Sequence, residues 1–135
     1  MMVSRQNGER TRVMIVEHDL DYGLKLADWL AAQGYHPVLL RTVEAAISEV
    51  NDIRPQAVFI GLRTSERGPQ VDAFEALLLI QTICPLVPVI TLGDQASEGF
   101  AQLVVRQGVR RFMVKPVEFA QIGHVLESEL GAIVA

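Results

Sequence analysis

The sequence feature that most constrains the fold is the stretch Ala57–Gly61, which reads AVFIG. It is a short, uninterrupted apolar run that lies between Pro55 and a polar segment ending at Gln70. Such a run is typical of a strand that is buried on both faces, as at the centre of a parallel sheet. In open α/β sheets the functional site lies beyond the carboxyl ends of the strands. Gly61 is therefore expected at that edge, although it has no side chain with which to do chemistry.

The rest of the chain alternates between strand and helix patterns. Strands are predicted over Arg12–Val16, residues 37–40, Ala57–Gly61, residues 87–92 and Arg111–Val114. Helices are predicted over residues 19–34, Val43–Ile53, Val71–Ile83, residues 97–107 and residues 118–130. Five strands and five helices with these crossover lengths predict right-handed βαβ units and a doubly wound α/β fold with a parallel sheet.

Local signals support the first helix. Asp19 is a good N-cap residue, and Gly34 is a natural stop after the last turn. Apolar residues recur between them at helical spacing: Leu20, Leu24, Ala27, Leu30 and Ala31. Residues 1–11 are polar and without periodicity, so they are expected to form a flexible N-terminal arm.

Size and composition suit one soluble domain. The chain has 135 residues, of which 50% are hydrophobic and 21% charged, with a net charge of −4. This balance argues against a nucleic-acid-binding surface spread over the whole molecule. The single cysteine, Cys84, has no partner within the chain for a disulfide and is expected to be a small core residue.

Neither a membrane span nor a secretion signal is visible. The longest purely apolar run, residues 76–80, is far too short to cross a bilayer, and residues 1–12 lack an apolar core. We therefore expect a cytoplasmic protein that makes no membrane contact.

Four motifs at the strand ends carry a resemblance. They are VMIVEHD from Val13, PQAVFIGL from Pro55, VPVITLGD from Val87 and RFMVKP from Arg111. Together, in this order and spacing, they resemble the receiver domain of bacterial two-component response regulators, the CheY-like superfamily. The resemblance implies a receiver-like domain over residues 12–135, with a flavodoxin-like sheet of strand order 2-1-3-4-5.

The resemblance also implies a phosphorylation pocket, and this chain departs from it. Receivers carry two acids after the first strand, an acceptor aspartate ending the third, a Ser or Thr ending the fourth and a lysine ending the fifth. Glu17 matches the first acid and Lys115 the lysine. His18 replaces the second acid, Gly61 the acceptor and Gly93 the hydroxyl.

Together these departures remove the nucleophile, one magnesium ligand and the hydroxyl that would contact a phosphoryl group. Imidazole is a poor ligand for magnesium, and without a carboxylate at position 61 no acyl phosphate can form there. The expectation is a degenerate receiver that is not an enzyme and holds no metal or cofactor. We also expect a direct ion pair between Glu17 and Lys115, which would make the pocket nearly neutral without a cation.

A partner surface is expected near the fifth strand. Arg106, Arg110 and Arg111 cluster there, on a face that many receivers use for dimers or effector domains. Phe112 takes the position of an aromatic residue that, in the family, turns inward when the hydroxyl at the end of the fourth strand follows the phosphoryl group. Because Gly93 has no hydroxyl, Phe112 is expected to be a simple core residue. The expected partner is a signalling protein, which is a kinase, an effector domain or a second copy of this chain. A second copy would be held through the fourth helix, the fifth strand and the last helix, with the arginines facing acids such as Glu118 or Glu127.

The segment of residues 63–70 is expected to be a solvated loop or a docking segment.

Other interpretations stay open at this point. One is a receiver phosphorylated at an unusual residue, with Thr64, Ser65 and Thr91 as substitute acceptors, or one that binds another anion against Lys115. A second is metal binding through His18. A third is the receiver part of a DNA-binding transcription regulator whose output domain is missing, although this domain itself is not expected to touch nucleic acid.

Overall fold

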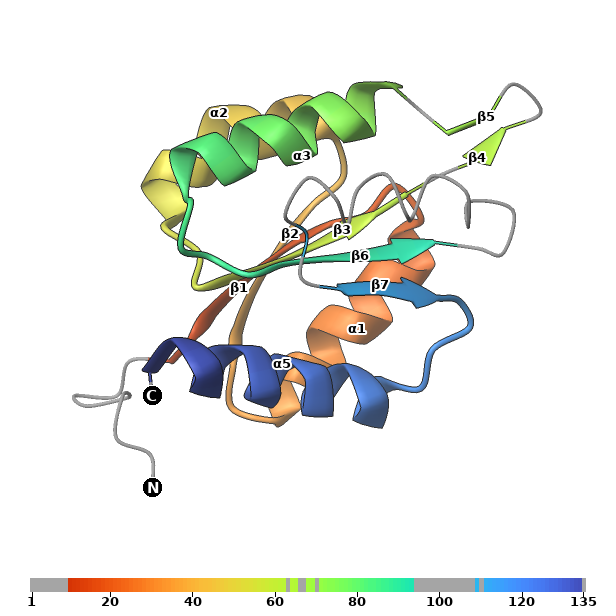
Figure 1. Cartoon of the computed structure of the whole chain (residues 1–135). Coiled ribbons are helices and arrows are strands. Elements are labelled where there is room, and N and C mark those ends of the chain that lie inside the picture. The colour runs from red at the N-terminus through yellow and green to blue at the C-terminus, as the bar shows by residue number, and fades with distance from the viewer. Residues whose placement is uncertain are drawn as a thin grey trace.

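The computed structural model describes residues 10–62, 64–65, 68–69, 71–93, 109 and 111–134. Its centre is a parallel sheet of five strands in the order β2-β1-β3-β6-β7 (Figure 1). The strands are β1 (Arg12–Val16), β2 (His36–Leu40), β3 (Ala57–Gly61), β6 (Val89–Gly93) and β7 (Arg111–Val114). Counted along this sheet the order is 2-1-3-4-5, which confirms the predicted doubly wound topology.

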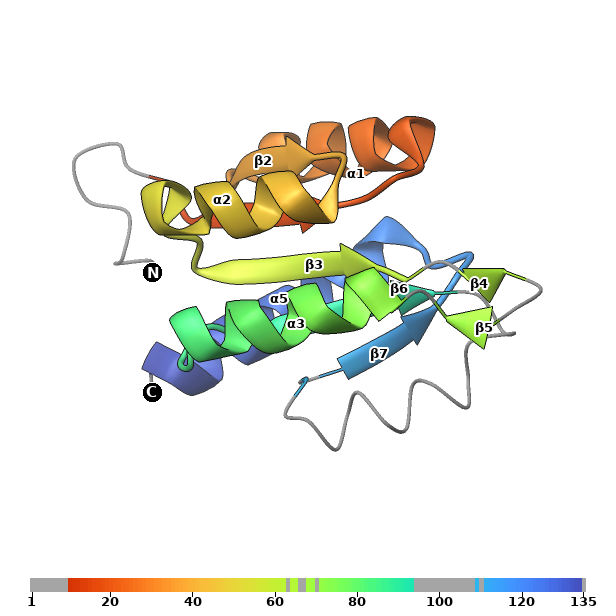
Figure 2. The ribbon, with the colours of Figure 1, turned by 90° about the horizontal axis from the view of Figure 1, so that it is seen from above.

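Helices cover both faces of the sheet. They are α1 (Leu20–Ala32), α2 (Val43–Ile53), α3 (Val71–Ile83) and α5 (Phe119–Val134). Figures 1 and 2 show α2 and α3 on one face, with α1 and α5 on the other. The helix predicted over residues 97–107 lies outside the described residues.

Each face of the sheet has its own core. Strand residues alternate between the faces, so Met14 and Val16 pack with α2 and α3, whereas Val13 and Ile15 pack with α1 and α5. Residues 57–60 of β3 are fully buried. The apolar run therefore forms the strand buried on both faces that its sequence predicts.

The inward face of α1 uses only part of the apolar repeat in its sequence. Leu30 is buried, but Leu20 and Leu24 are 38% and 54% exposed, and the other buried residues are Gly23 and Leu26. The helix carries two apolar stripes with the same spacing, and periodicity alone does not say which one meets the sheet. The buried stripe includes Gly23, where a β-carbon would lie 2.9 Å from Leu39 Cδ1, so the helix packs closely there.

The segment after β3 also differs from the prediction. In place of a plain loop it contains a small antiparallel pair, β4 (Thr64–Ser65) with β5 (Gly68–Pro69). The two strands turn back on each other near the carboxyl edge of the main sheet (Figure 2).

Element ends shift by a few residues elsewhere. β2 begins one residue earlier than predicted, β6 spans Val89–Gly93 instead of 87–92, and α5 continues to Val134. Residues 1–9 of the predicted arm lie outside the described residues, but Thr11 is buried and its carbonyl accepts a hydrogen bond from the His36 amide at 2.8 Å. Among the described helices, none combines the length and the apolar character that crossing a membrane requires.

Candidate functional site

The site lies at the carboxyl edge of the sheet and is built by strand ends. Val16 of β1 pairs with Ile60 of β3, so Glu17 follows β1 beside Gly61. The Glu17 amide donates to the Leu40 carbonyl at 3.0 Å, which fixes the chain as it leaves β1. Lys115 follows β7, and its amide donates to the Gly93 carbonyl at 2.6 Å.

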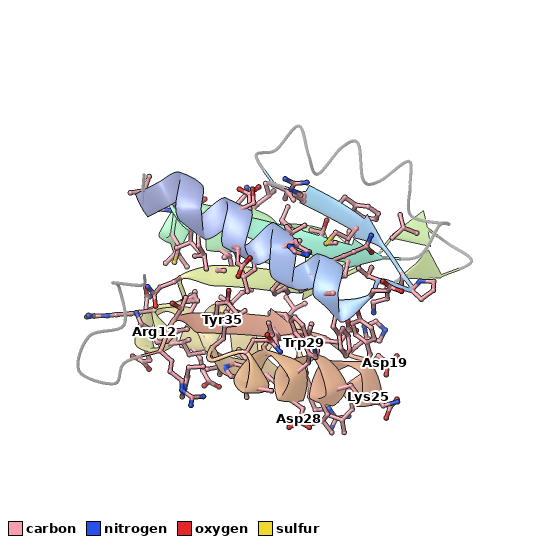
Figure 3. All side chains as sticks on the ribbon, turned by 90° about the horizontal axis from the view of Figure 1, so that it is seen from below. Arg12, Asp19, Lys25, Asp28, Trp29 and Tyr35 are labelled. Atoms are coloured by element: carbon pink, nitrogen blue, oxygen red, sulfur yellow. The ribbon has the colours of Figure 1, made fainter. Side chains whose placement is uncertain are left out.

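The turn between β1 and α1 is closed by a helix cap. Asp19 has extended backbone angles, and its side chain accepts a hydrogen bond from the Tyr22 amide at 3.2 Å. This is the N-cap that the sequence predicts. Figure 3 shows Asp19 at the start of α1.

A buried ion pair joins the first and last strand ends. Lys115 Nζ lies 2.8 Å from Glu17 Oε1 and donates a hydrogen bond to it. The Glu17 side chain is only 1% exposed and that of Lys115 is 22% exposed. The expected pair is therefore confirmed, and it supplies the opposite charge that a buried carboxylate needs.

The second oxygen of Glu17 is also engaged. Oε2 accepts a hydrogen bond from the Asp19 amide at 3.1 Å and lies 3.4 Å from Nδ1 of His18. His18 is thus part of the site, although its side chain is 38% exposed. Within the described residues, no three His, Cys, Asp or Glu side chains lie in an arrangement that could hold a metal ion.

The Glu17 carboxylate occupies the space in front of Gly61. A β-carbon built on Gly61 would lie 2.5 Å from Glu17 Oε1, 2.8 Å from Cδ and 2.9 Å from Oε2. Real β-carbons essentially never approach another atom so closely. A side chain at position 61 would therefore require the Glu17 carboxylate, the far end of its side chain, to move from its bonds to Lys115 and to the Asp19 amide.

An aromatic side chain that sequence reasoning missed completes the surroundings of Lys115. Its ammonium nitrogen lies 4.3 Å from the centroid of the Tyr22 ring, within the range of a cation–π interaction. The Tyr22 hydroxyl is buried and has no hydrogen-bond partner in the structure as described. Burial, followed by the nearby Glu17 charge, raises the pKa of Tyr22 to about 12.

Tyr22 also begins a row of aromatic rings. Its ring meets Phe119 of α5 edge-on, with centroids 5.9 Å apart, and Phe119 lies 6.0 Å from Trp29. The one sequence signal that could have pointed to Tyr22 is its place in the first turn of a helix that leaves the acidic turn. A single aromatic residue there carries no periodicity, so only the packing of α1 against α5 identifies its role.

The remaining pocket positions agree with their expected places. Gly93 ends β6, is buried and pairs with Val114 in the sheet, so Gly61, Gly93, Glu17 and Lys115 do meet at one edge. The Thr91 hydroxyl is fully buried and donates to the Arg111 carbonyl at 3.3 Å, away from solvent. Thr64 and Ser65 lie in β4.

The expected partner surface is only partly within the described residues. Arg106 and Arg110 lie outside them. Arg111 is paired within the chain, since its Nε lies 3.4 Å from Glu129 Oε2 on α5. Phe112 is partly buried against the core under α2 and α3. Cys84 packs against the same core and is partly buried, and that burial raises the pKa of its thiol.

Comparison with solved structures shows the same fold in receiver domains. The CheY-like response regulator receiver domain protein from Methanospirillum hungatei JF-1 superposes with a TM-score of 0.82 over 92% of this chain and 96% of its own, at 16% identity. The receiver domain of NtrX from Brucella abortus superposes with a TM-score of 0.78 over 88% of this chain and 98% of its own, at 23% identity. The chain thus has the fold of a CheY-like response regulator receiver domain.

Curated relatives are found among longer regulators. The transcriptional regulatory protein ZraR of Klebsiella oxytoca is 24% identical over 124 residues, which are 92% of this chain and 27% of ZraR. The nitrogen assimilation regulatory protein NtrX of Azorhizobium caulinodans is 25% identical over 118 residues, 87% of this chain and 26% of NtrX. The chain spans about a quarter of the length of these relatives. No family model matches it.

Proposed function

We propose that this chain is a receiver-like domain of two-component signal transduction that works without phosphorylation, as a protein-interaction module. The observation that carries the proposal is the Glu17 carboxylate lying in front of Gly61. The place where a receiver would hold its acceptor side chain is taken by a carboxylate from another strand, already paired with Lys115.

Glu17 is itself a poor substitute acceptor. A carboxylate nucleophile must be reached by the phosphoryl donor, but this side chain is 1% exposed and both of its oxygens have partners. A phosphodonor would first have to displace Lys115 from it. The alternative of phosphorylation at an unusual residue is thus unsupported at this position.

The charge balance of the pocket removes the usual need for a metal. A receiver with three carboxylates and one lysine gains from a divalent cation, because the cation relieves repulsion between the acids. Here one buried carboxylate faces one ammonium group at 2.8 Å. The pair gives a neutral pocket whose conformation does not depend on magnesium or phosphate.

A protein-interaction module of this kind works by binding a partner protein with its surface. The partner that we propose is another protein of a cytoplasmic signalling pathway: a kinase, an effector domain or a second copy. In this proposal the domain performs no catalysis and makes no direct contact with nucleic acid.

A second candidate is the receiver part of a transcription regulator. The observation that favours it is the length of ZraR and NtrX, of which this chain matches only about a quarter. Reading the natural open reading frame on both sides of this sequence tests it, since an output domain would support this candidate.

Incubation with acetyl phosphate and magnesium, followed by intact-mass measurement, tests the main proposal. We expect no gain of a phosphoryl group on the wild-type chain. Gly61→Asp alone is expected to stay unlabelled, because its side chain would collide with the Glu17 carboxylate. A wild-type mass gain of one phosphoryl group would overturn the proposal.

A triple variant provides the positive control. Glu17→Asp shortens the side chain that fills the pocket, His18→Asp supplies the second acid and Gly61→Asp supplies the nucleophile. We expect this variant to be labelled, because it has both the space and the oxygen ligands that magnesium prefers. Labelling of the triple variant but not of the double variant His18→Asp, Gly61→Asp would show that position 17 blocks the site.

A further inference from the structure

A small pocket lies between α1 and α5, on the opposite side of the domain from α2 and α3. Its volume is about 240 Å³, and its lining includes Trp29, Gln33, Tyr35, Gly123, His124 and Glu127. Figure 3 labels Trp29 and Tyr35 on this side of the sheet. The site described above lies at the carboxyl edge, and of the residues that line this pocket only Trp29 is connected to it, through the aromatic row.

The pocket depends on a glycine in the middle of α5. A β-carbon on Gly123 would lie 2.8 Å from Cη2 of Trp29, so the indole packs directly against the helix backbone. Glycine inside a helix costs about 1 kcal/mol relative to alanine. That cost is offset here by a close contact that leaves the Trp29 ring as one wall of the pocket.

Aromatic side chains dominate the inner wall. Tyr35 is only 5% exposed, and Trp29 is partly buried, with its ring centroid 6.0 Å from that of Phe119 in the aromatic row. A half-buried indole face attracts a cation through its quadrupole, more strongly than Tyr or Phe does. The wall therefore favours a positively charged group that sheds some of its water.

The charges around the pocket also favour a positively charged ligand. Glu127 is exposed at the rim, and α5 contains no Lys or Arg between Phe119 and Val134. The other acid of this helix, Glu129, is paired with Arg111. Among the lining residues the one carboxylate is Glu127 and none is Lys or Arg, while His124 adds an imidazole.

The end of α1 borders the pocket through Gln33 and Tyr35, and its last turn has no basic residue. Its carbonyls are already engaged: those of Trp29, Leu30 and Ala31 accept the backbone amides of residues 33–35, and Arg10 also donates to the Ala31 carbonyl at 3.4 Å. The preference of the pocket for a cation therefore rests on its aromatic side chains and its one carboxylate.

We infer that this pocket is a binding site for a small organic cation with an alkylammonium or guanidinium group. Its volume corresponds to about eight water molecules at roughly 30 Å³ each. Pockets for drug-sized ligands are larger, about 300–1,000 Å³. The inference is independent of the proposed function, because it rests on neither Glu17 nor Gly61.

The chain offers a direct probe of this site, since Trp29 is its single tryptophan. The full chain is titrated with choline and with arginine amide while Trp29 fluorescence is followed, and calorimetry repeats each titration. We expect a saturable change with at least one cation. The uncharged choline isostere 3,3-dimethylbutanol and sodium chloride at equal ionic strength should give no saturable change.

Variants separate this pocket from general charge effects. Glu127→Gln should weaken binding about threefold, as expected for an exposed ion pair. Gly123→Ala should abolish it by pushing the indole out of place. Glu49→Gln, which removes an exposed acid from α2 on the other face, should bind like the wild type.

Three results would overturn the inference. The first is the absence of both a fluorescence change and heat with either cation. The second is equal binding of the uncharged isostere, and the third is equal weakening by Glu127→Gln and Glu49→Gln. Circular dichroism of each variant checks that the fold is intact, and Glu127→Gln carries the test if Gly123→Ala does not fold.

Discussion

Residues 17 and 61 share one space at the carboxyl edge of the sheet. Glutamate has one methylene more than aspartate, and the longer side chain lets Glu17 reach both the front of Gly61 and the ammonium group of Lys115. Glycine at 61 is then the residue that leaves this space free. The glutamate at position 17 and the glycine at position 61 are thus physically linked, because the carboxylate lies where a side chain at position 61 would begin.

This shared space predicts the effect of a single methyl group. Gly61→Ala should destabilise the domain by about 1–3 kcal/mol, the usual range for overpacking a filled interior. Gly131→Ala is the matched control, because a β-carbon there meets nothing within 4 Å and alanine favours the helix. It should stabilise by about 0.4–1 kcal/mol. Urea unfolding measures both, and equal stability of Gly61→Ala and wild type would contradict the packing argument.

At the scale of elements, α1, α5 and the end of β7 meet around Tyr22. Its ring contacts Phe119 of α5 on one side and the Lys115 ammonium on another. The same row continues to Trp29, so one line of packed rings runs from the ion pair to the pocket between the helices. The aromatic rings of α1 and α5 therefore border the ion pair on the face of the sheet opposite to α2 and α3.

The buried position of Tyr22 predicts an unusual titration. Its pKa is raised to about 12, first by burial and then by Glu17, against 10.0 for an ordinary tyrosine. The unfolded chain therefore loses this proton at lower pH than the folded chain. The stability that this group contributes should be present below about pH 10 and should fall as the pH rises towards 12.

Tyrosinate absorbance as a function of pH measures this shift. The chain has two tyrosines, so Tyr22→Phe identifies which of them titrates late. Glu17→Gln should move the late titration to lower pH, because it removes the second cause of the shift. A Tyr22 titration near pH 10 in the folded protein would contradict the burial seen here.

At the scale of the whole molecule, the strand order decides the charge of the pocket. The order β2-β1-β3-β6-β7 gathers the ends of β1, β3, β6 and β7, and with them Glu17, Gly61, Gly93 and Lys115, at one edge. In a receiver with a full set of acids this edge would attract magnesium. The ion pair neutralises it here.

Thermal unfolding with and without magnesium tests this neutrality. Millimolar magnesium chloride should leave the melting temperature of the wild-type chain unchanged, relative to sodium chloride of equal ionic strength. The triple variant Glu17→Asp, His18→Asp, Gly61→Asp should be stabilised, by about 2.7 kcal/mol when magnesium exceeds its Kd a hundredfold. A magnesium-specific rise in the wild type would show that the pocket still holds the metal.

The sequence by itself determined the sheet and the identity of the pocket. Five elements, β1, α2, β3, α3 and β7, have the bounds that were predicted, because apolar runs and helix caps are local signals. Position in the strand pattern also placed Gly61, Gly93 and Lys115 at one edge. Opposite charges at strand ends on the same edge of the sheet were enough to predict the pair of Glu17 and Lys115.

Only the tertiary structure decided which atoms share space. Glu17 and Lys115 are 98 residues apart, and the distance from the Glu17 carboxylate to Gly61 depends on how β1 and β3 lie beside each other. The buried stripe of α1, the role of Tyr22 and the contact of Trp29 with Gly123 arise in the same way. Sequence periodicity repeats within one element, whereas these contacts are set by the packing of elements against each other, for which local patterns hold no information.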